Sequence, residues 1–557
     1  MTEFFKKNWK IIIFAAVVAV GIFLRVWHFH DWLFFKMDQA RDASLTRQAF
    51  EKGPGWLPLL GPKAGGTHLN LGPVFYYFQY AAAVLFHSVS PSVLAYPDLF
   101  FSILSIPLFY LLLKKYFDRN WSMILASAYA LCFLAIEYSR FSWNPNALPF
   151  FNLLFFYALL NVFDEKVKYR LRWVAVAGLS FAVSTQLHFL SFLTLPLVTL
   201  VFLWFERKGL RKYLDWKKVI LFLAMVMILY APVVANEIHT HGANSKEFVA
   251  AIHSKASNHA LWENITRDFS YFGQNWLTIL TGYIVKNNDS LPANLTWIFF
   301  MIPALVLNLK FYREEKDAVK KKFLLLTFCW FVVYFLAYIP IAFDIRPRFF
   351  LPMITLPFMF AGYISQFFLR LEKPKKIIWI GLAFAIPAVL ILANLLGTYQ
   401  WFKEIESAQK KGIYPNRTII LKARDGIVLW HLENAVDFMA ASCPKSTVYY
   451  NSAPEYGRPI KYLLALKGKN GLSLTDVKTV DQNTCYFDTK LTRAANSKLS
   501  ESLGSEFSAT GEKKFGAYTV RTLKPNDSFV DQVLPTFHKS VDDLQNSKRV
   551  FFKDIFK

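Results

Sequence analysis

The sequence predicts a mainly α-helical protein that crosses a membrane about eleven times and ends in a soluble α/β domain. Hydrophobic residues make up 54% of the 557 residues, and aromatic residues make up 18%. Apolar runs of roughly 17–25 residues recur along the chain, and this is the length that spans a bilayer. The predicted crossings are residues 11–27, 93–113, 120–137, 146–163, 173–189, 191–205, 218–236, 293–310, 322–342, 349–371 and 377–398.

The charge pattern orients these crossings. Lysine and arginine gather in short loops between the apolar runs, as they do in cytoplasmic loops. The formal net charge of +24 therefore reflects topology, and we expect no nucleic-acid partner. With these loops inside, the chain starts inside and ends outside. The loops are residues 114–115, 166–172, 206–218, 313–322 and 372–376.

The first apolar run has two readings. It follows Lys6, Lys7 and Lys10, as the core of a signal peptide would. However, it continues to Trp27 without a small-residue cleavage site, so we interpret it as a retained helix.

A further apolar run, Pro73 to Val89, is long enough to span. A crossing there would move the basic pair 114–115 outside and Arg140 inside, against the charge pattern. We therefore expect this run to lie along the outer interface, where its tyrosines suit an aromatic belt.

The outer side then receives residues 28–91, residues 236–291 and everything after residue 398. We divide the chain into a transmembrane domain, residues 1–398, and a soluble domain, residues 399–557, which carries short apolar runs among polar turns. Cys443 and Cys485 are the only cysteines of the soluble domain. A disulfide between them suits an oxidising outer compartment, and two free thiols are an equal alternative.

Unusual polar side chains gather on the predicted outer side. In residues 38–43 (DQARDA), Asp38, Arg41 and Asp42 share one face of a helix. Arginine suits phosphate, and a carboxylate beside a hydroxyl can act as a general base. The other candidates are His68, Asn70, Tyr76 and Tyr77 in the first outer segment, Arg140, Trp143 and Asn144 in a short second turn, and Arg346 and Arg348 in a later turn.

Each candidate also has a simpler structural reading. Asp38 could cap a helix that runs to Lys52 and stops at Gly53. Arg346 and Arg348 could anchor a helix at the interface. The coincidence of all these residues on one side favours a functional site. The segment 236–291 carries four histidines that we interpret as solvated. We predict neither a metal nor another cofactor, and we interpret the segment as a gate.

The order of these motifs resembles the GT-C membrane glycosyltransferases, in particular the protein O-mannosyltransferases and the ArnT-like aminoarabinose transferases. In that group an Asp-Glu-Ala-Arg-Tyr-Ala motif follows the first helix, and residues 38–43 match it with Asp38 at the position of the catalytic aspartate. The resemblance covers roughly residues 1–400 and includes the Arg-Phe-Phe-Leu-Pro run at 348–352. Two residues depart from it: Gln39 replaces the second acid, and Asn144 stands where another aspartate is common.

The resemblance implies an inverting transfer of a sugar from a polyprenyl-phosphate donor to the hydroxyl of a protein, lipid or glycan, at the outer face of a prokaryotic plasma membrane. Asp38 would be the base, oriented by Arg41 and Asp42. The donor phosphate would be bound by Arg346, Arg348 and Arg140. The sugar and the acceptor would be bound by His68, Asn70, Tyr76, Tyr77, Trp143 and Asn144.

Two other functions compete with this one. A transporter or flippase of lipid-linked sugars would also need charges and lipid contacts, although transporters usually hold polar groups near the bilayer midplane. A non-catalytic membrane scaffold would leave the polar cluster unexplained.

Overall fold

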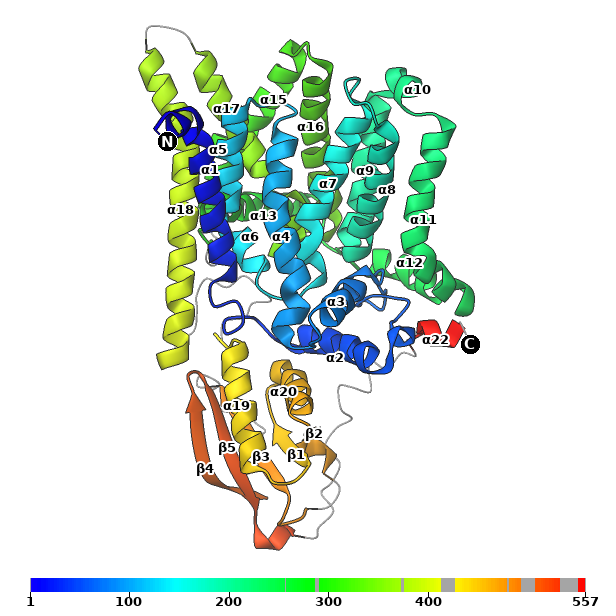
Figure 1. Cartoon of the computed structure of the whole chain (residues 1–557), viewed down its shortest axis with the longest axis vertical. Helices are drawn as coiled ribbons and strands as arrows, with labels where there is room; N and C mark the ends of the chain where they lie inside the picture. The colour runs from blue at the N-terminus through cyan, green and yellow to red at the C-terminus, as the bar shows by residue number, and fades with distance from the viewer. Residues whose placement is uncertain are drawn as a thin grey trace.

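The computed structural model describes residues 2–255, 257–285, 290–371, 375–411, 426–477, 480–491, 506–530 and 549–555. Figure 1 shows a bundle of long helices with a smaller, sheet-containing domain beneath one end. Part of the basic loop 372–376 and of the segment 236–291 lies outside the described residues, as do several stretches of the soluble domain.

Each predicted crossing coincides with a helix or an interrupted helix. Among the described residues, seven helices are long and apolar enough to cross a membrane, or nine if each of two bent pairs counts as one span. The count of eleven stays a prediction. The helices that coincide with the eleven predicted crossings are, in chain order, α1 (Thr2–Val26), α4 (Pro91–Leu113), α5 (Arg119–Ala130) with α6 (Phe133–Tyr138), η2 (Asn144–Ala147) with α7 (Leu148–Val162), α8 (Arg170–Leu187), α9 (Phe189–Phe205), α11 (Trp216–His239), α14 (Ser290–Thr296) with η4 (Trp297–Met301) and α15 (Ile302–Glu314), α16 (Ala318–Tyr338), η6 (Pro347–Met353) with α17 (Leu356–Arg370), and α18 (Lys376–Lys411).

The last of these helices extends beyond the boundary expected at residue 398. α18 has 36 residues, which corresponds to about 54 Å and exceeds a hydrocarbon core of about 30 Å. Its far end reaches towards the soluble domain (Figure 1). The sequence boundary at 398 therefore falls inside a helix, because the polar residues that follow it do not interrupt helical geometry.

Two short helices lie at the end of the bundle beside the soluble domain. α2 (Met37–Lys52) and α3 (Val74–Leu85) cover this end, and the η1 turn (Pro54–Trp56) follows α2 (Figure 1). The 12 residues of α3 extend about 18 Å, too short to cross a bilayer. The helix thus fits the expectation that residues 73–89 do not span. The short basic-loop helix α10 (Leu210–Tyr213) lies at the opposite end.

The predicted gate, residues 236–291, consists largely of helix rather than loop. It contains α12 (Ala243–Lys255) and α13 (Leu261–Thr281), in addition to the end of α11 and the start of α14. α13 packs its buried Phe272 and Trp276 among the aromatic rings of the bundle. A Cβ atom at Gly273 would come within 2.5 Å of the carbonyl oxygen of Ala293, so this glycine lets α13 and α14 approach closely.

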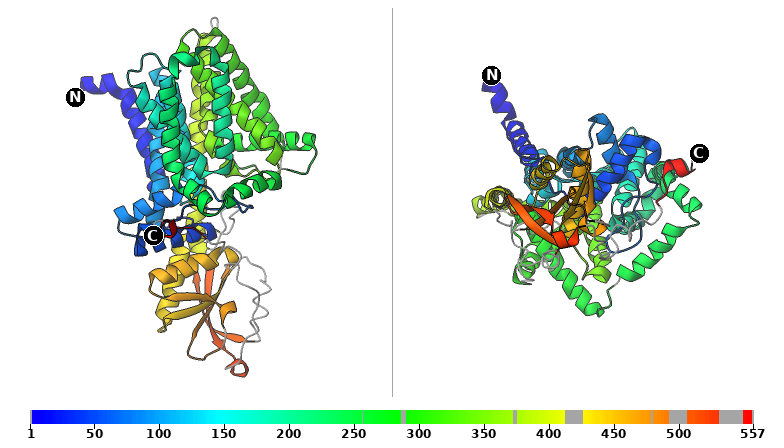
Figure 2. Two further views of the ribbon diagram at one scale, coloured as in Figure 1. Left: turned by 90° about the vertical axis from the view of Figure 1, so that its right-hand side faces the viewer. Right: turned by 90° about the horizontal axis from the view of Figure 1, so that it is seen from below.

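In the described part of the soluble domain, two helices pack against a five-stranded sheet. The strands are β1 (Thr447–Asn451), β2 (Asn470–Ser473), β3 (Cys485–Leu491), β4 (Phe507–Phe515) and β5 (Tyr518–Pro525), and their order is β2-β1-β3-β5-β4. β1 pairs in parallel with β2 and β3, whereas β5 is antiparallel to β3 and β4. The helices α19 (Leu429–Ser442) and α20 (Pro454–Leu466) contact each other and pack against the sheet (Figure 2). The α/β prediction is therefore confirmed.

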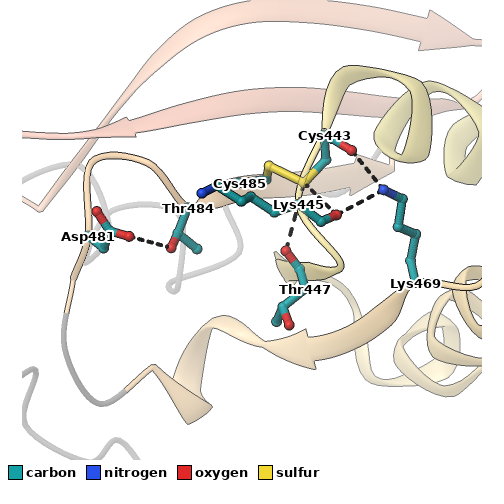
Figure 3. The surroundings of a disulfide bond; sticks show 7 residues. All are labelled: Cys443, Lys445, Thr447, Lys469, Asp481, Thr484 and Cys485. Atoms are coloured by element: carbon teal, nitrogen blue, oxygen red, sulfur yellow. Dashed lines mark hydrogen bonds between the residues drawn. A yellow bond between two sulfur atoms is a disulfide. The ribbon is translucent and has the colours of Figure 1, made fainter.

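A disulfide joins Cys443, just after α19, to Cys485 at the start of β3. The lysine Lys469 donates hydrogen bonds to the carbonyl oxygens of Cys443 and Lys445, which fixes the turn next to the bridge (Figure 3). Of the two alternatives that the sequence left open, the structure therefore has the disulfide.

The soluble domain contacts the bundle through several specific pairs. Lys36, at the start of α2, forms an ion pair with Glu455 of α20 at 3.2 Å. His30, beyond the end of α1, contacts Glu433 of α19 at 2.9 Å. The backbone N–H of Leu429 also donates to the carbonyl oxygen of Leu33. These contacts hold the domain against the end of the bundle where α2 lies.

Candidate active site

α2 presents its acidic residues from the first turn. Lys36 is the N-cap residue, and the side-chain oxygen of Gln39 accepts the backbone N–H of Lys36 at 3.2 Å. Asp38 is therefore inside the helix and does not cap it, contrary to the simpler reading of the sequence. The helix ends at Lys52 as expected, because Gly53 has a φ of 95° that favours glycine.

Arg41 joins the two carboxylates of this helix. Its Nη1 donates to Asp38 Oδ1 at 3.0 Å. Its Nε and Nη2 donate to Asp42 Oδ1 at 2.9 Å and Oδ2 at 3.1 Å, a bidentate arrangement. The side chain of Asp38 is 32% exposed, whereas that of Asp42 is 1% exposed. The expected pairing on one helix face is present, and the two acids have different environments.

Burial strongly affects the pKa values of Asp42 and Arg41, the more buried pair of this cluster. Desolvation raises the pKa of the Asp42 carboxyl above its usual range, although the Arg41 charge and hydrogen bonds oppose this shift. Desolvation lowers the pKa of Arg41, but the charges of Asp42, Tyr76 and Asp38 outweigh it, so the net pKa is raised. Arg41 therefore stays protonated. Among the described residues, Asp38 Oδ2 accepts no hydrogen bond.

α3 places Tyr76 against this pair. The Tyr76 hydroxyl donates to Asp42 Oδ1 at 2.9 Å, and its side chain is completely buried. One turn further along α3, Gln79 accepts from Thr46 of α2 and donates to Ser142. These bonds fix α2 against α3 and against the turn that carries Trp143.

Arg348 approaches the same region from the η6 segment. Its guanidinium carbon lies 5.0 Å from the centroid of the Trp143 ring, a cation–π contact. It also interacts electrostatically with Asp38, Arg346 and Tyr138. The prolines at 347 and 352 cannot donate backbone hydrogen bonds, and η6 meets α17 at a bend of 57°. The bend keeps both arginines at the end of the bundle near α2.

Arg140 does not join this group. It is completely buried, and its Nη1 and Nη2 donate to the carbonyl oxygens of Leu24, Arg25, Trp27 and His28. Carbonyls at a helix C-terminus lack intrahelical partners, so this arginine satisfies the end of α1. Because backbone carbonyls already occupy its Nη1 and Nη2 groups, we do not expect Arg140 to bind the donor phosphate, contrary to the prediction from the sequence.

Four other candidates from the sequence form no hydrogen bond or ion pair with the Asp38–Arg41–Asp42 cluster among the described residues. Tyr77 donates to the carbonyl of Pro58, and the amide of Asn144 donates to the carbonyl of Leu187. His68 is exposed. The Asn244 side chain of α12 pairs with both backbone groups of Asn70, at 2.8 and 3.0 Å.

One residue near the site was missed in the sequence. Asp98 of α4 is 3% exposed, and its Oδ2 accepts the backbone N–H of Trp143 at 3.1 Å. An acid inside an apolar crossing is a functional candidate by default, and this signal was available in the sequence. Asp98 acts here by holding the Trp143 backbone.

In the part of the chain that the structure describes, no three His, Cys, Asp or Glu side chains come together as a metal site.

Comparisons with known proteins place this geometry in context. A family model described as dolichyl-phosphate-mannose-protein mannosyltransferase matches residues 70–235, less than half of the chain. No curated protein sequence matches. ArnT from Cupriavidus metallidurans, in a structure bound to undecaprenyl phosphate, superposes with a TM-score of 0.56 at 13% identity, covering 94% of this chain and 99% of that chain. Its apo structure gives 0.55 at 13% identity, covering 95% and 99%.

The archaeal oligosaccharyltransferase AglB from Archaeoglobus fulgidus gives a TM-score of 0.48 at 12% identity, covering 88% of this chain and 70% of that chain. At such identities the likeness to ArnT is one of fold. The protein is an integral membrane protein with a GT-C type fold, as the resemblance of its motifs implied.

Proposed function

We propose that this chain is an inverting glycosyltransferase that transfers a sugar from a polyprenyl-phosphate donor to an acceptor hydroxyl at the outer face of the membrane. The observation that carries the proposal is the environment of the Asp38 side chain. One of its oxygens is held by Arg41, the side chain is partly exposed, and the Arg348 cation lies within electrostatic range. A base and a cation for a leaving phosphate thus share one end of the bundle.

Asp38 would take the proton of the acceptor hydroxyl, and the acceptor oxygen would attack the anomeric carbon opposite the phosphate. The bond from that carbon to the phosphate oxygen breaks, and polyprenyl phosphate leaves with both bonding electrons. Arg348 and Arg346 would stabilise the charge that develops on the phosphate. The Trp143 ring supports the guanidinium of Arg348 and fixes its position.

The shared fold supports the choice of donor. ArnT, which covers almost the whole chain in superposition, was crystallised with undecaprenyl phosphate. In this proposal the helical part of residues 1–398 binds the donor, and the soluble domain of residues 399–557 holds the acceptor near α2. Trp143, which contacts the guanidinium of Arg348, would orient the sugar.

The test uses the purified full chain in lipid nanodiscs with undecaprenyl-phosphate and dolichyl-phosphate hexoses and pentoses as donor probes, and with a serine- and threonine-containing peptide, a glycolipid and a glycan as acceptor probes. We expect release of free polyprenyl phosphate with at least one donor, and inversion at the anomeric carbon by NMR. In sealed vesicles, movement of an intact donor between leaflets without such release would instead identify a flippase.

A further inference from the structure

The last described residues of the chain return to the first segment after α1. Residues 549–555, here called the clasp, include the short helix α22 (Phe552–Ile555), which lies beside α2 and α3 (Figure 1). The backbone N–H of Leu59 donates to the carbonyl of Val550 at 3.0 Å, and that of Phe552 donates to the carbonyl of Leu57 at 3.2 Å. Pro58 and Phe551 form the antiparallel bridge between them.

Side chains strengthen this docking. The ring of Trp56 contacts Phe551, with a distance of 5.8 Å between centroids, and the ammonium group of Lys553 lies over the Trp56 ring. Tyr77 contacts Phe552, with 6.2 Å between ring centroids. Tyr77 was expected to bind sugar, and its ring instead faces the clasp.

The clasp brings Arg549 to the acidic cluster of α2. Arg549 Nη1 lies 3.5 Å from the Tyr76 hydroxyl oxygen, and the guanidinium carbon lies 5.8 Å from the ring centroid. The same hydroxyl donates to Asp42, which Arg41 links to Asp38. A continuous set of contacts therefore runs from Arg549 to the proposed base.

The contact between Arg549 and Tyr76 also changes the charge balance around the acidic residues of α2. Arg41 is the cation that the carboxylates of Asp38 and Asp42 bind directly, and Arg348 of η6 lies within electrostatic range of Asp38. On the Tyr76 side of the cluster, Arg549 adds a further positive charge close to the buried Asp42. An uncompensated charge in a buried site is costly, so the added cation favours the ionised form of the buried Asp42.

We propose that Arg549 is a positioning residue for the Asp38–Arg41–Asp42–Tyr76 cluster, and that the site is complete only when the clasp is docked. This inference rests on the proposed function for its kinetic consequence, but the docking itself does not. α2 would then be held at its start by Glu455 of the soluble domain and beyond its end by the clasp.

The first experiment tests docking without any substrate. Pro58 and Phe551 form a pair flanked by hydrogen bonds, and Cα atoms approach most closely at such non-hydrogen-bonded positions. In the full chain, the Pro58→Cys/Phe551→Cys variant is expected to form a disulfide on mild oxidation, measured as protection of both thiols from a maleimide label. Two thiols that stay freely labelled would overturn the docked clasp.

The second experiment tests positioning. Arg549→Gln removes a positive charge close to the buried Asp42 carboxyl, whose pKa burial already raises, so the acid limb of the turnover profile should shift to higher pH, with a several-fold loss at low pH. Arg549→Lys should restore the profile. Lys524→Gln removes the same charge from an exposed position on β5, outside the clasp, and is expected to keep the wild-type profile. Identical profiles for Arg549→Gln and Lys524→Gln would contradict the proposal.

A double-mutant cycle keeps this test independent of catalysis. Thermal unfolding of Arg549→Gln, Tyr76→Phe and the double variant should show that the two effects are not additive, because the residues contact each other. Additive effects would overturn the positioning role. If the wild-type chain releases no polyprenyl phosphate, the proposed function fails, while the cycle and the disulfide still decide the inference about Arg549.

Discussion

Arg41 binds Asp42 through two parallel hydrogen bonds and uses its remaining Nη1 nitrogen to hold one oxygen of Asp38. A single guanidinium thus fixes an almost fully buried carboxylate and a partly exposed one on adjacent turns of α2. Breaking a buried ion pair by removing one partner typically costs about 3–5 kcal/mol. The buried pair of Arg41 and Asp42 is therefore a rigid support, and the partly exposed Asp38 is the acid available for chemistry.

The first prediction separates these two acids. Asp38→Asn keeps the shape of the side chain and removes the base, so turnover of a polyprenyl-phosphate sugar should fall by about 10²–10⁴-fold. Its unfolding temperature should change little, because Asp38 is partly exposed. Turnover by release of polyprenyl phosphate and a thermal melt of the same sample check both expectations. A folded Asp38→Asn protein with wild-type turnover would exclude Asp38 as the base.

The second prediction contrasts two arginines that look alike in the sequence. Arg348→Gln should reduce turnover by about 10²-fold or more through loss of a cation near the leaving phosphate. Arg348→Lys should recover part of it, since lysine keeps the charge but lacks the planar fork. The measurement is steady-state kinetics with a defined donor.

Arg140→Gln is the matched comparison. It leaves buried carbonyl oxygens at the end of α1 without donors, at a cost of roughly 1–3 kcal/mol for each unsatisfied group. We expect lower thermal stability and lower yield, with the apparent affinity for the donor unchanged in the protein that folds. A stable Arg140→Gln protein with weakened donor binding would return Arg140 to the phosphate site.

The difference between these arginines shows where sequence reasoning reaches its limit. Apolar runs, basic loops and the helix from Met37 to Lys52 were predictable, because hydrophobic length, charge bias and a terminal glycine are local signals. The partners of Arg140 are more than a hundred residues away in the chain, and no local pattern points to them. The contact of Arg549 with Tyr76 spans 473 positions and is invisible for the same reason.

Gln39 is a case in which a local signal was present but had a different meaning. The resemblance presents it as a missing acid, and the structure shows its side-chain oxygen accepting the backbone N–H of Lys36. A side chain three residues after the N-cap that reaches back to the cap is the second half of a capping box. The departure from the family motif therefore has a structural reason in the start of α2.

The third prediction concerns the contact between His30 and Glu433. The hydrogen bond to Glu433 raises the pKa of His30 above 6.5, with smaller help from the charges of Glu433 and Asp31. A raised pKa means that the stabilisation is fully present below pH 6.5 and is lost as the pH rises through the folded-state value. Because the His30 side chain is 48% exposed and that of Glu433 is 29% exposed, solvent screening should keep the effect modest.

Thermal unfolding across pH 5–9 checks this expectation. The wild type should lose stability over the upper part of the range relative to Glu433→Gln, which removes the acceptor charge and leaves His30 in place. If the two proteins show parallel pH dependence, His30 does not contribute through Glu433.

The last prediction concerns Asp268 of α13, a buried acid that the proposed chemistry does not use. Neither of its oxygens has a hydrogen-bond partner among the described residues, and burial raises its pKa to about 8. Because its unfolded-state pKa is near 3.8, this acid favours folding at low pH, and that contribution is lost progressively as the pH rises from about 4 to 8. Asp268→Asn has a similar shape and no titration. Its free energy of unfolding relative to wild type should therefore increase between pH 4 and 8, at most by about 1.4 kcal/mol per pH unit, and then level off. A constant difference over this range would mean that Asp268 has a partner charge that offsets its burial.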